Sequence, residues 1–206
     1  TLDMELADRI FPCLCSISLI KWNNSTVISS FSTLINPELE IEPFMSNHHN
    51  ITESDIKSSP TLREVWPYIM NFIEGNVVFT HKGNSDIKYL KTCIDLDKNV
   101  FPDFQFGSVE SIFKRTFPDA ESKTLHKMLE YLKLDSKCNN SLLDARSLGL
   151  IINSACKETQ TSNINELFDK IGYAGGFVVD NTINLYKAKK LTKNKRTDNL
   201  VYLMYV

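Results

Sequence analysis

The stretch TLDMEL, residues 1–6, places two acids two positions apart among apolar side chains. Side chains two apart on a strand point to the same face, so Asp3 and Glu5 would point the same way. Burying two unpaired carboxylates is costly, and neighbouring negative charges raise each other's pKa. If the strand is buried, the pattern predicts that both acids meet a positive partner. Alternatively, the strand simply ends near solvent.

The bulk composition is that of an ordinary globular protein. The chain has 206 residues, 42% of them hydrophobic and 23% charged, which is enough for one sizeable core. No apolar run approaches the ~20 residues of a membrane span, and no signal peptide is visible. Five cysteines without a CxxC pair argue against zinc and disulfide frameworks. These features predict a cytoplasmic protein with reduced thiols and no membrane partner.

Charge is distributed unevenly along the chain. Residues 187–206 hold six basic residues and one acid, a net charge of +5. Because the whole chain carries −2, residues 1–186 carry −7. Charge alone therefore does not indicate a nucleic-acid-binding body. The basic run could hold a nucleic-acid backbone, or it could be a solvated linker, which is the commoner role of such runs.

The order of the predicted elements indicates the fold class. Three strands come first, the second and third forming a hairpin around an Asn-Asn-Ser turn. A helix follows, with Ser59 as its cap, Gly75 at its end and a kink or late start at Pro67. Strands and helices then alternate, which predicts an α/β fold with a mixed sheet. The later stretches are strands at 76–80 and 104–106 and helices at 81–94, 108–117, 122–134, 141–158 and 163–171.

Two further acids fall on helix faces that otherwise read as buried. Asp86 is followed by Leu90, Cys93 and Ile94 at positions i+4, i+7 and i+8, and Asp144 is followed by the same apolar pattern. Either acid alone is more simply explained as a first-turn acid that favours the helix dipole. Together with the first pair, they indicate a carboxylate cluster for hard cations.

These segments resemble the motifs of the DEDD (DnaQ-like) 3′–5′ exonucleases, the superfamily of the proofreading epsilon subunit of bacterial DNA polymerase III. LDMEL (2–6) is similar to the first motif, D-x-E. VVFTHKGNSDIKYL (77–90) is similar to the second, V-x-H-N-A-x-F-D-x-x-x-L, with Lys, Gly and Ser in place of Asn, Ala and Phe. NNSLLDARSLG (139–149) is similar to the third, H-x-A-L-x-D-A, and HHNITESDI (48–56) to the H-G-I-T segment. Three motifs in register are a fairly specific signal.

The resemblance implies a ribonuclease H-like α/β fold, with a mixed five-stranded sheet flanked by helices. We expect an exonuclease-like domain over residues 1–157 and an extension with the basic segment over 158–206. The implied activity is two-metal-ion 3′–5′ hydrolysis of phosphodiester bonds at a single-stranded DNA or RNA 3′ end. The implied further partner is a polymerase or another replication or repair protein.

The resemblance also assigns the site residues. Asp3, Glu5 and Asp144 would bind one Mg²⁺ or Mn²⁺ ion, and Asp3 would be shared with a second ion that Asp86 supports. Substrate-binding positions are implied for three further residues, namely Leu6, His49 and His81.

One position departs from the common histidine branch of the superfamily. The general-base histidine would lie five residues before Asp144, where this chain has Asn139. An amide has no usable pKa near 7, so Asn139 cannot accept a proton from water. Metal ions alone could activate the water, or another group such as His81 could replace the base. The alternative function is a catalytically degenerate exonuclease fold that binds nucleic acid or another protein.

Overall fold

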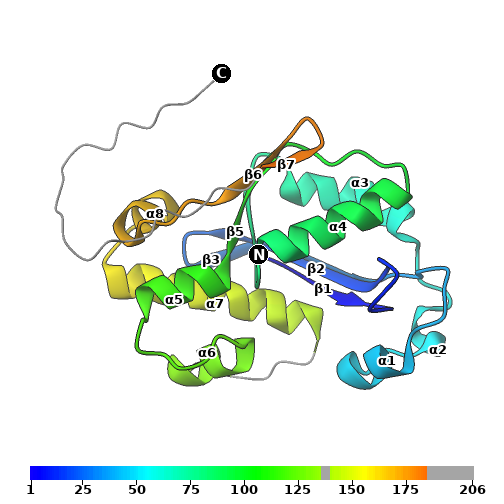
Figure 1. The fold of residues 1–206 in the computed structure, drawn as a ribbon, viewed down its shortest axis with the longest axis horizontal. Coiled ribbons are helices and arrows are strands. Elements are labelled where there is room, and N and C mark those ends of the chain that lie inside the picture. The colour runs from blue at the N-terminus through cyan, green and yellow to red at the C-terminus, as the bar shows by residue number, and fades with distance from the viewer. Residues whose placement is uncertain (136–139, 185–206) are drawn as a thin grey trace.

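A computed structural model of the chain describes residues 1–135 and 140–184 (Figure 1). The first three strands form an antiparallel sheet in the order β1-β2-β3. The β2–β3 hairpin turns through Asn24, which adopts a positive φ of 50°. The predicted hairpin is therefore confirmed. The bounds are β1 Leu2–Leu6, β2 Leu14–Asn23 and β3 Thr26–Leu34.

A second sheet has the order β4-β5-β6-β7. Its first pair is parallel and the other two pairs are antiparallel, which gives the mixed arrangement predicted for an α/β fold. Strands β1 and β4 are neighbours, so the two sheets adjoin there. The predicted five strands are thus present as β1 to β5, with β6 and β7 added beyond β5. The bounds are β4 Val77–Thr80, β5 Phe104–Ser108, β6 Gly176–Val179 and β7 Thr182–Asn184.

Helices flank the sheets, and most of the core lies in two clusters, with a smaller third cluster around α1 and α2. One buried cluster packs β1, β2 and β4 to β6 against α3 and α4, and a second joins α5, α6, α7 and α8 with Phe79 of β4. No helix in residues 1–135 and 140–184 is both long and apolar enough to cross a membrane. The bounds are α1 Pro43–His49, α2 Glu53–Ile56, α3 Leu62–Ile73, α4 Asn84–Leu96, α5 Val109–Thr116, α6 Leu125–Tyr131, α7 Ser141–Thr159 and α8 Ile164–Ile171.

The N-cap of helix α3 lies two residues later than predicted. Thr61, not Ser59, is the N-cap: its hydroxyl accepts from the Glu64 N–H, and the Glu64 carboxylate accepts from the Thr61 N–H at 2.7 Å. This reciprocal capping box satisfies two helix-end donors at once, which Ser59 could not do. Of the two alternatives predicted at Pro67, the late start is wrong, because the helix runs from Leu62 with Pro67 in its interior; the kink stays a prediction.

The predicted domain boundary at residue 157 falls inside α7, which ends at Thr159. Leu167 and Ile171 of α8 pack in the same cluster as α7, and β6 pairs with β5. Residues 158–184 therefore share the core of the preceding residues. The basic run lies in residues 185–206, outside the described part of the chain, so a separate extension stays a prediction.

Helix α7 crosses β2 closely at Gly149. A Cβ added at Gly149 would overlap the indole ring of Trp22, and the same indole N–H donates to the Thr1 hydroxyl at 3.0 Å. Glycine in a helix interior costs about 1 kcal/mol relative to alanine. The close approach of α7 to the Trp22 ring explains why glycine is nevertheless present at position 149.

We expect Gly149→Ala to lower the free energy of unfolding, because overpacking typically costs about 1–3 kcal/mol and exceeds the propensity gain. Chemical denaturation measures the effect. The same substitution in a Trp22→Leu background supplies the control, where removal of the ring should make Gly149→Ala neutral or stabilising. Equal effects in both backgrounds would contradict this account of the contact.

Candidate metal centre

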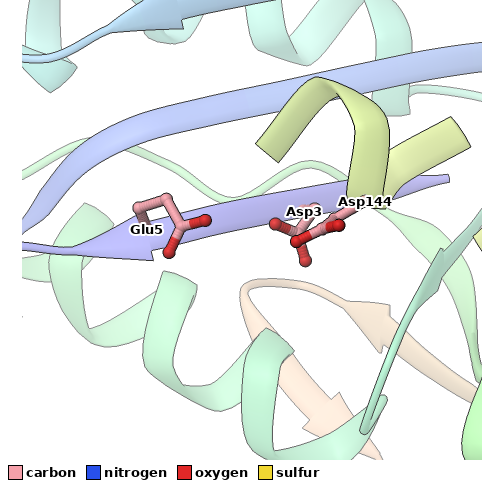
Figure 2. A group of neighbouring side chains, drawn as sticks. All are labelled: Asp3, Glu5 and Asp144. Carbon is pink, nitrogen blue, oxygen red and sulfur yellow. The ribbon is translucent and has the colours of Figure 1, made fainter. Parts of the chain in front are cut away.

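Three carboxylates from two elements converge at one point (Figure 2). Asp3 and Glu5 project from β1, and Asp144 projects from the first turn of α7. One ligand oxygen from each lies within 4.8 Å of the other two. The structure thus brings together residues that lie about 140 positions apart in the sequence. Carboxylate oxygens at this spacing are a hard donor set of the kind that Mg²⁺ and Mn²⁺ prefer.

The alternation of side chains along β1 explains why Asp3 and Glu5 face α7. Leu2, Met4 and Leu6 pack into the cluster that contains α3 and α4. Alternation along a strand then sends Asp3 and Glu5 to the opposite side, where α7 contacts β1 and β2. The strand register of the first six residues therefore sets the direction of two site carboxylates.

Burial and neighbouring negative charges raise the pKa values of Asp3 and Glu5. Burial is the largest cause for Asp3, whose pKa lies well above its ordinary value, followed by the charges of Glu5, Asp144 and Asp86. Burial and then the charge of Asp144 raise the pKa of Glu5 to about 7. Such mutual repulsion favours either protonation or the binding of a cation. The donor set and its electrostatics therefore both fit a divalent ion.

Asp86 stands apart from the three converging acids. It is not among the residues whose ligand oxygens lie within 4.8 Å of one another, yet its charge contributes to the raised pKa of Asp3. Its Oδ2 accepts from the N–H of Lys82 at 2.8 Å. This position suits the supporting role that the resemblance implies for Asp86 better than direct membership of the triad.

The turn that presents Asp86 is tightly packed. Gly83 adopts a positive φ of 59°, and its N–H donates to the hydroxyl of the buried Thr80 at 2.9 Å. A Cβ at Gly83 would lie 2.8 Å from the Cβ of Ser108. Glycine thus replaces the Ala of the family motif because neither the backbone conformation nor the space admits a side chain.

A cluster of buried serines holds the start of α7 against β2. The Ser141 hydroxyl lies 2.7 Å from both the Ser16 and the Ser18 hydroxyls, and all three residues are buried. Ser141 is the first residue of α7, three positions before Asp144. Buried hydroxyls need partners, so these bonds favour one placement of α7 along the sheet. Motif comparison missed this cluster. The only signal was the run of small polar residues inside an otherwise apolar strand.

The structure places the predicted substrate-binding histidines in backbone contacts. The His49 ring is buried; its Nε2–H donates to the Leu6 carbonyl at 3.0 Å, and its Nδ1 accepts from the Ile51 N–H at 3.1 Å. Burial lowers the pKa of His49, which favours this neutral form. His49 thereby supports the end of β1, where Leu6 lies half-buried beside Glu5.

His81 lies on the β4–α4 turn and donates from Nε2 to the Lys123 carbonyl at 2.9 Å. Its own carbonyl accepts from the Glu110 N–H and the Ser108 hydroxyl. These contacts tie the turn to α5 and to the segment before α6. Asn139, at the general-base position, lies outside the described residues. The substrate and base roles of these residues stay predictions.

A model of the exonuclease family RNase_T matches residues 8–161, well over half of the 206 residues. The chain belongs to this exonuclease family. The matched range includes Asp86 and Asp144 and begins just after Asp3 and Glu5. The DnaQ-like resemblance that the motifs indicate is thus confirmed.

Curated relatives of this exonuclease domain include DNA polymerase III proteins. The epsilon subunit of Treponema pallidum (strain Nichols) is 31% identical over 91 residues, which cover 44% of this chain and 40% of that protein. A PolC-type DNA polymerase III of Caldanaerobacter subterraneus subsp. tengcongensis is 30% identical over 79 residues, 38% of this chain and 6% of that protein. The aligned residues thus span less than half of either relative.

Solved exonuclease structures share the fold. Exonuclease X in complex with 5′ overhanging duplex DNA aligns with a TM-score of 0.64 at 14% identity, covering 83% of this chain and 98% of that one. The nuclease domain of 3′hExo, a DEDDh family member bound to rAMP, aligns with a TM-score of 0.68 at 17% identity. The alignment covers 80% of this chain and 94% of that one. The predicted ribonuclease H-like α/β fold is therefore confirmed.

The raised pKa of Glu5 predicts how stability depends on pH in the absence of divalent ions. A carboxyl group with a raised pKa in the folded state stabilises that state when protonated, and this contribution is lost as the pH rises. For Glu5 the window runs from its ordinary 4.5 to about 7. We expect the thermal unfolding midpoint in EDTA to fall across this window, and Mn²⁺ to reverse the fall at pH 8.

Asp144→Asn is the control for this experiment, because it removes the charge that acts on Glu5 through space. Its midpoint in EDTA should depend less on pH, and Mn²⁺ should stabilise it less. A wild-type midpoint that is flat from pH 4.5 to 7, or that Mn²⁺ leaves unchanged at pH 8, would contradict the electrostatic account.

Proposed function

We propose that the chain is a metal-dependent 3′–5′ exonuclease that hydrolyses phosphodiester bonds at nucleic-acid 3′ ends. The observation that carries the proposal is the convergence of Asp3, Glu5 and Asp144 within 4.8 Å in a chain of the exonuclease family. The three acids come from the first and third motifs, in the order that the family resemblance requires. Asp86 of the second motif acts on the same centre through its charge.

The proposed cofactors are two divalent ions, Mg²⁺ or Mn²⁺. Asp3, Glu5 and Asp144 would hold one ion, with Asp3 shared by a second that Asp86 supports. Bound there, the ions would stabilise the attacking and leaving oxygens of an in-line displacement. The chain itself contributes a fixed arrangement of oxygen donors, because β1 holds Asp3 and Glu5 and the first turn of α7 holds Asp144.

The proposed substrate is a single-stranded DNA or RNA 3′ end. Similar structures include a complex with 5′ overhanging duplex DNA and one described as 3′-end-specific recognition of a histone mRNA stem-loop. Both kinds of nucleic acid are therefore compatible with the fold. The DNA polymerase III relatives support a polymerase as a partner for this chain.

Asn139 favours a second candidate function, a nuclease fold that binds nucleic acid or a protein without cleaving it. A positioned general base typically contributes about 10²–10⁴-fold to the rate, and an amide cannot supply it. The intact carboxylate cluster supports a slow enzyme over an inactive protein. An inactive protein would have no need to keep several acids that repel one another.

Asp144→Asn should abolish cleavage, because it removes one of the three converging carboxylates. The measurement is the shortening of a 5′-labelled single-stranded oligonucleotide in Mn²⁺, resolved on a sequencing gel so that 3′–5′ degradation gives a ladder. Asp119→Asn, a change at an exposed acid, is the matched control and should cleave like wild type. Equal cleavage by wild type and Asp144→Asn would refute the proposed enzyme.

Asn139→His tests whether only the general base is missing. We expect the cleavage rate to rise at least tenfold, and by as much as about 10²–10⁴-fold if the imidazole is well placed. The rate should also gain a pH dependence near the ordinary histidine pKa of about 6.5. An unchanged rate and pH profile would show that the histidine position does not limit this chain.

A further inference from the structure

We propose that Lys82 binds a phosphate group of the nucleic-acid substrate beside the metal centre. This inference rests on the proposed function and names a substrate-binding residue that the motif comparison does not assign. Lys82 takes the place of Asn in the second motif. The replacement puts a positively charged residue in the turn whose backbone N–H contacts the Asp86 carboxylate.

The backbone of Lys82 is fixed at the edge of the site. Its N–H donates to Asp86 Oδ2 at 2.8 Å, and the following residue, Gly83, is held by Thr80 and packed against Ser108. The position of residue 82 is therefore set by contacts on both sides. A side chain that starts there can contact a ligand at the centre without any movement of the backbone.

The ammonium group of Lys82 remains available to such a ligand. The side chain is exposed, and within the described residues Lys82 forms no ion pair, although Asp86 lies beside its backbone. Lysine carries a compact charge on a flexible stem and is a common phosphate ligand. An exposed, unpaired ammonium beside an acidic centre can therefore meet an incoming phosphate.

Other cations close to the site in sequence are less suited to this role. Arg9 pairs with Glu42 and lies over the ring of Phe44, 4.3 Å from its centroid. Lys88 and Arg146 each follow a site acid by two positions on a helix. Helix residues two apart do not face the same side, so both point away from the acids that precede them.

The charge balance makes such a contact useful. Residues 1–186 carry a net charge of −7, which opposes the approach of a polyanion. Affinity for nucleic acid comes largely from cations that neutralise phosphates and release counterions. A local lysine at the metal centre supplies one such contact where the terminal phosphodiester must lie.

The test compares wild type with Lys82→Met, which keeps the stem and removes the charge. Binding of a 5′-fluorescein-labelled single-stranded oligonucleotide is followed by anisotropy in Ca²⁺ over a series of salt concentrations. Loss of one phosphate contact should reduce the slope of log K against log salt by about 0.7. At 0.1 M salt this slope corresponds to about fivefold weaker binding, and in Mn²⁺ we expect KM to rise with kcat nearly unchanged.

Lys82→Arg should restore the slope, and Lys88→Met, at an exposed lysine of α4, should behave like wild type. A wild-type slope in Lys82→Met, or an equal loss in Lys88→Met, would overturn the assignment. If wild type binds but does not cleave, the proposed enzyme fails while the salt slope still decides the role of Lys82. If wild type does not bind at all, both proposals fail.

Discussion

The repulsion among the site carboxylates is the constraint that the rest of this fold must withstand. Asp3 is half-buried, and the charges of Glu5, Asp144 and Asp86 each make its ionisation less favourable. The packed core must hold the acids together against this repulsion. The core contacts of β1 and α7 do this from two sides. A divalent cation would then turn an unfavourable cluster into a binding site.

Two specific contacts hold α7 against β2 in spite of this repulsion. The hydroxyls of Ser16, Ser18 and Ser141 meet in the buried space between β2 and the start of α7. One and a half helical turns beyond Asp144, Gly149 lets the helix approach the ring of Trp22. One contact is polar and the other depends on shape, and both favour the same placement of α7. Asp144 is therefore directed to β1 by interactions that do not involve the acids.

The second motif shows how a departure from the family pattern can be physically consistent. Gly83 occupies a conformation and a space that exclude the usual Ala. Lys82 donates its backbone N–H to Asp86 and adds a positive charge where the motif has Asn. The changes preserve the presentation of the acid and alter what surrounds it. Variation here would modify how substrate is held without disturbing the oxygen donors.

The sequence by itself predicted strands β1 to β5, helices α3 to α8, the mixed α/β class and the identity of the acids, but not helices α1 and α2 or strands β6 and β7. Hydrophobic alternation and helical periodicity are local properties, so they can be read along the chain. The predicted cap of α3 was wrong because two candidate hydroxyls, Ser59 and Thr61, are close together. Only the reciprocal bond with Glu64 selects between them.

Only the tertiary structure decided which of these acids meet. It gathers Asp3, Glu5 and Asp144 and leaves Asp86 to act through its charge. It also engages His49 and His81 with backbone carbonyls, a detail that no motif spacing contains. The distance between residues far apart in sequence depends on the register of strands and the placement of helices. Those are set by contacts such as Ser141 with β2, whose trace along the chain is limited to small polar residues in an otherwise apolar strand.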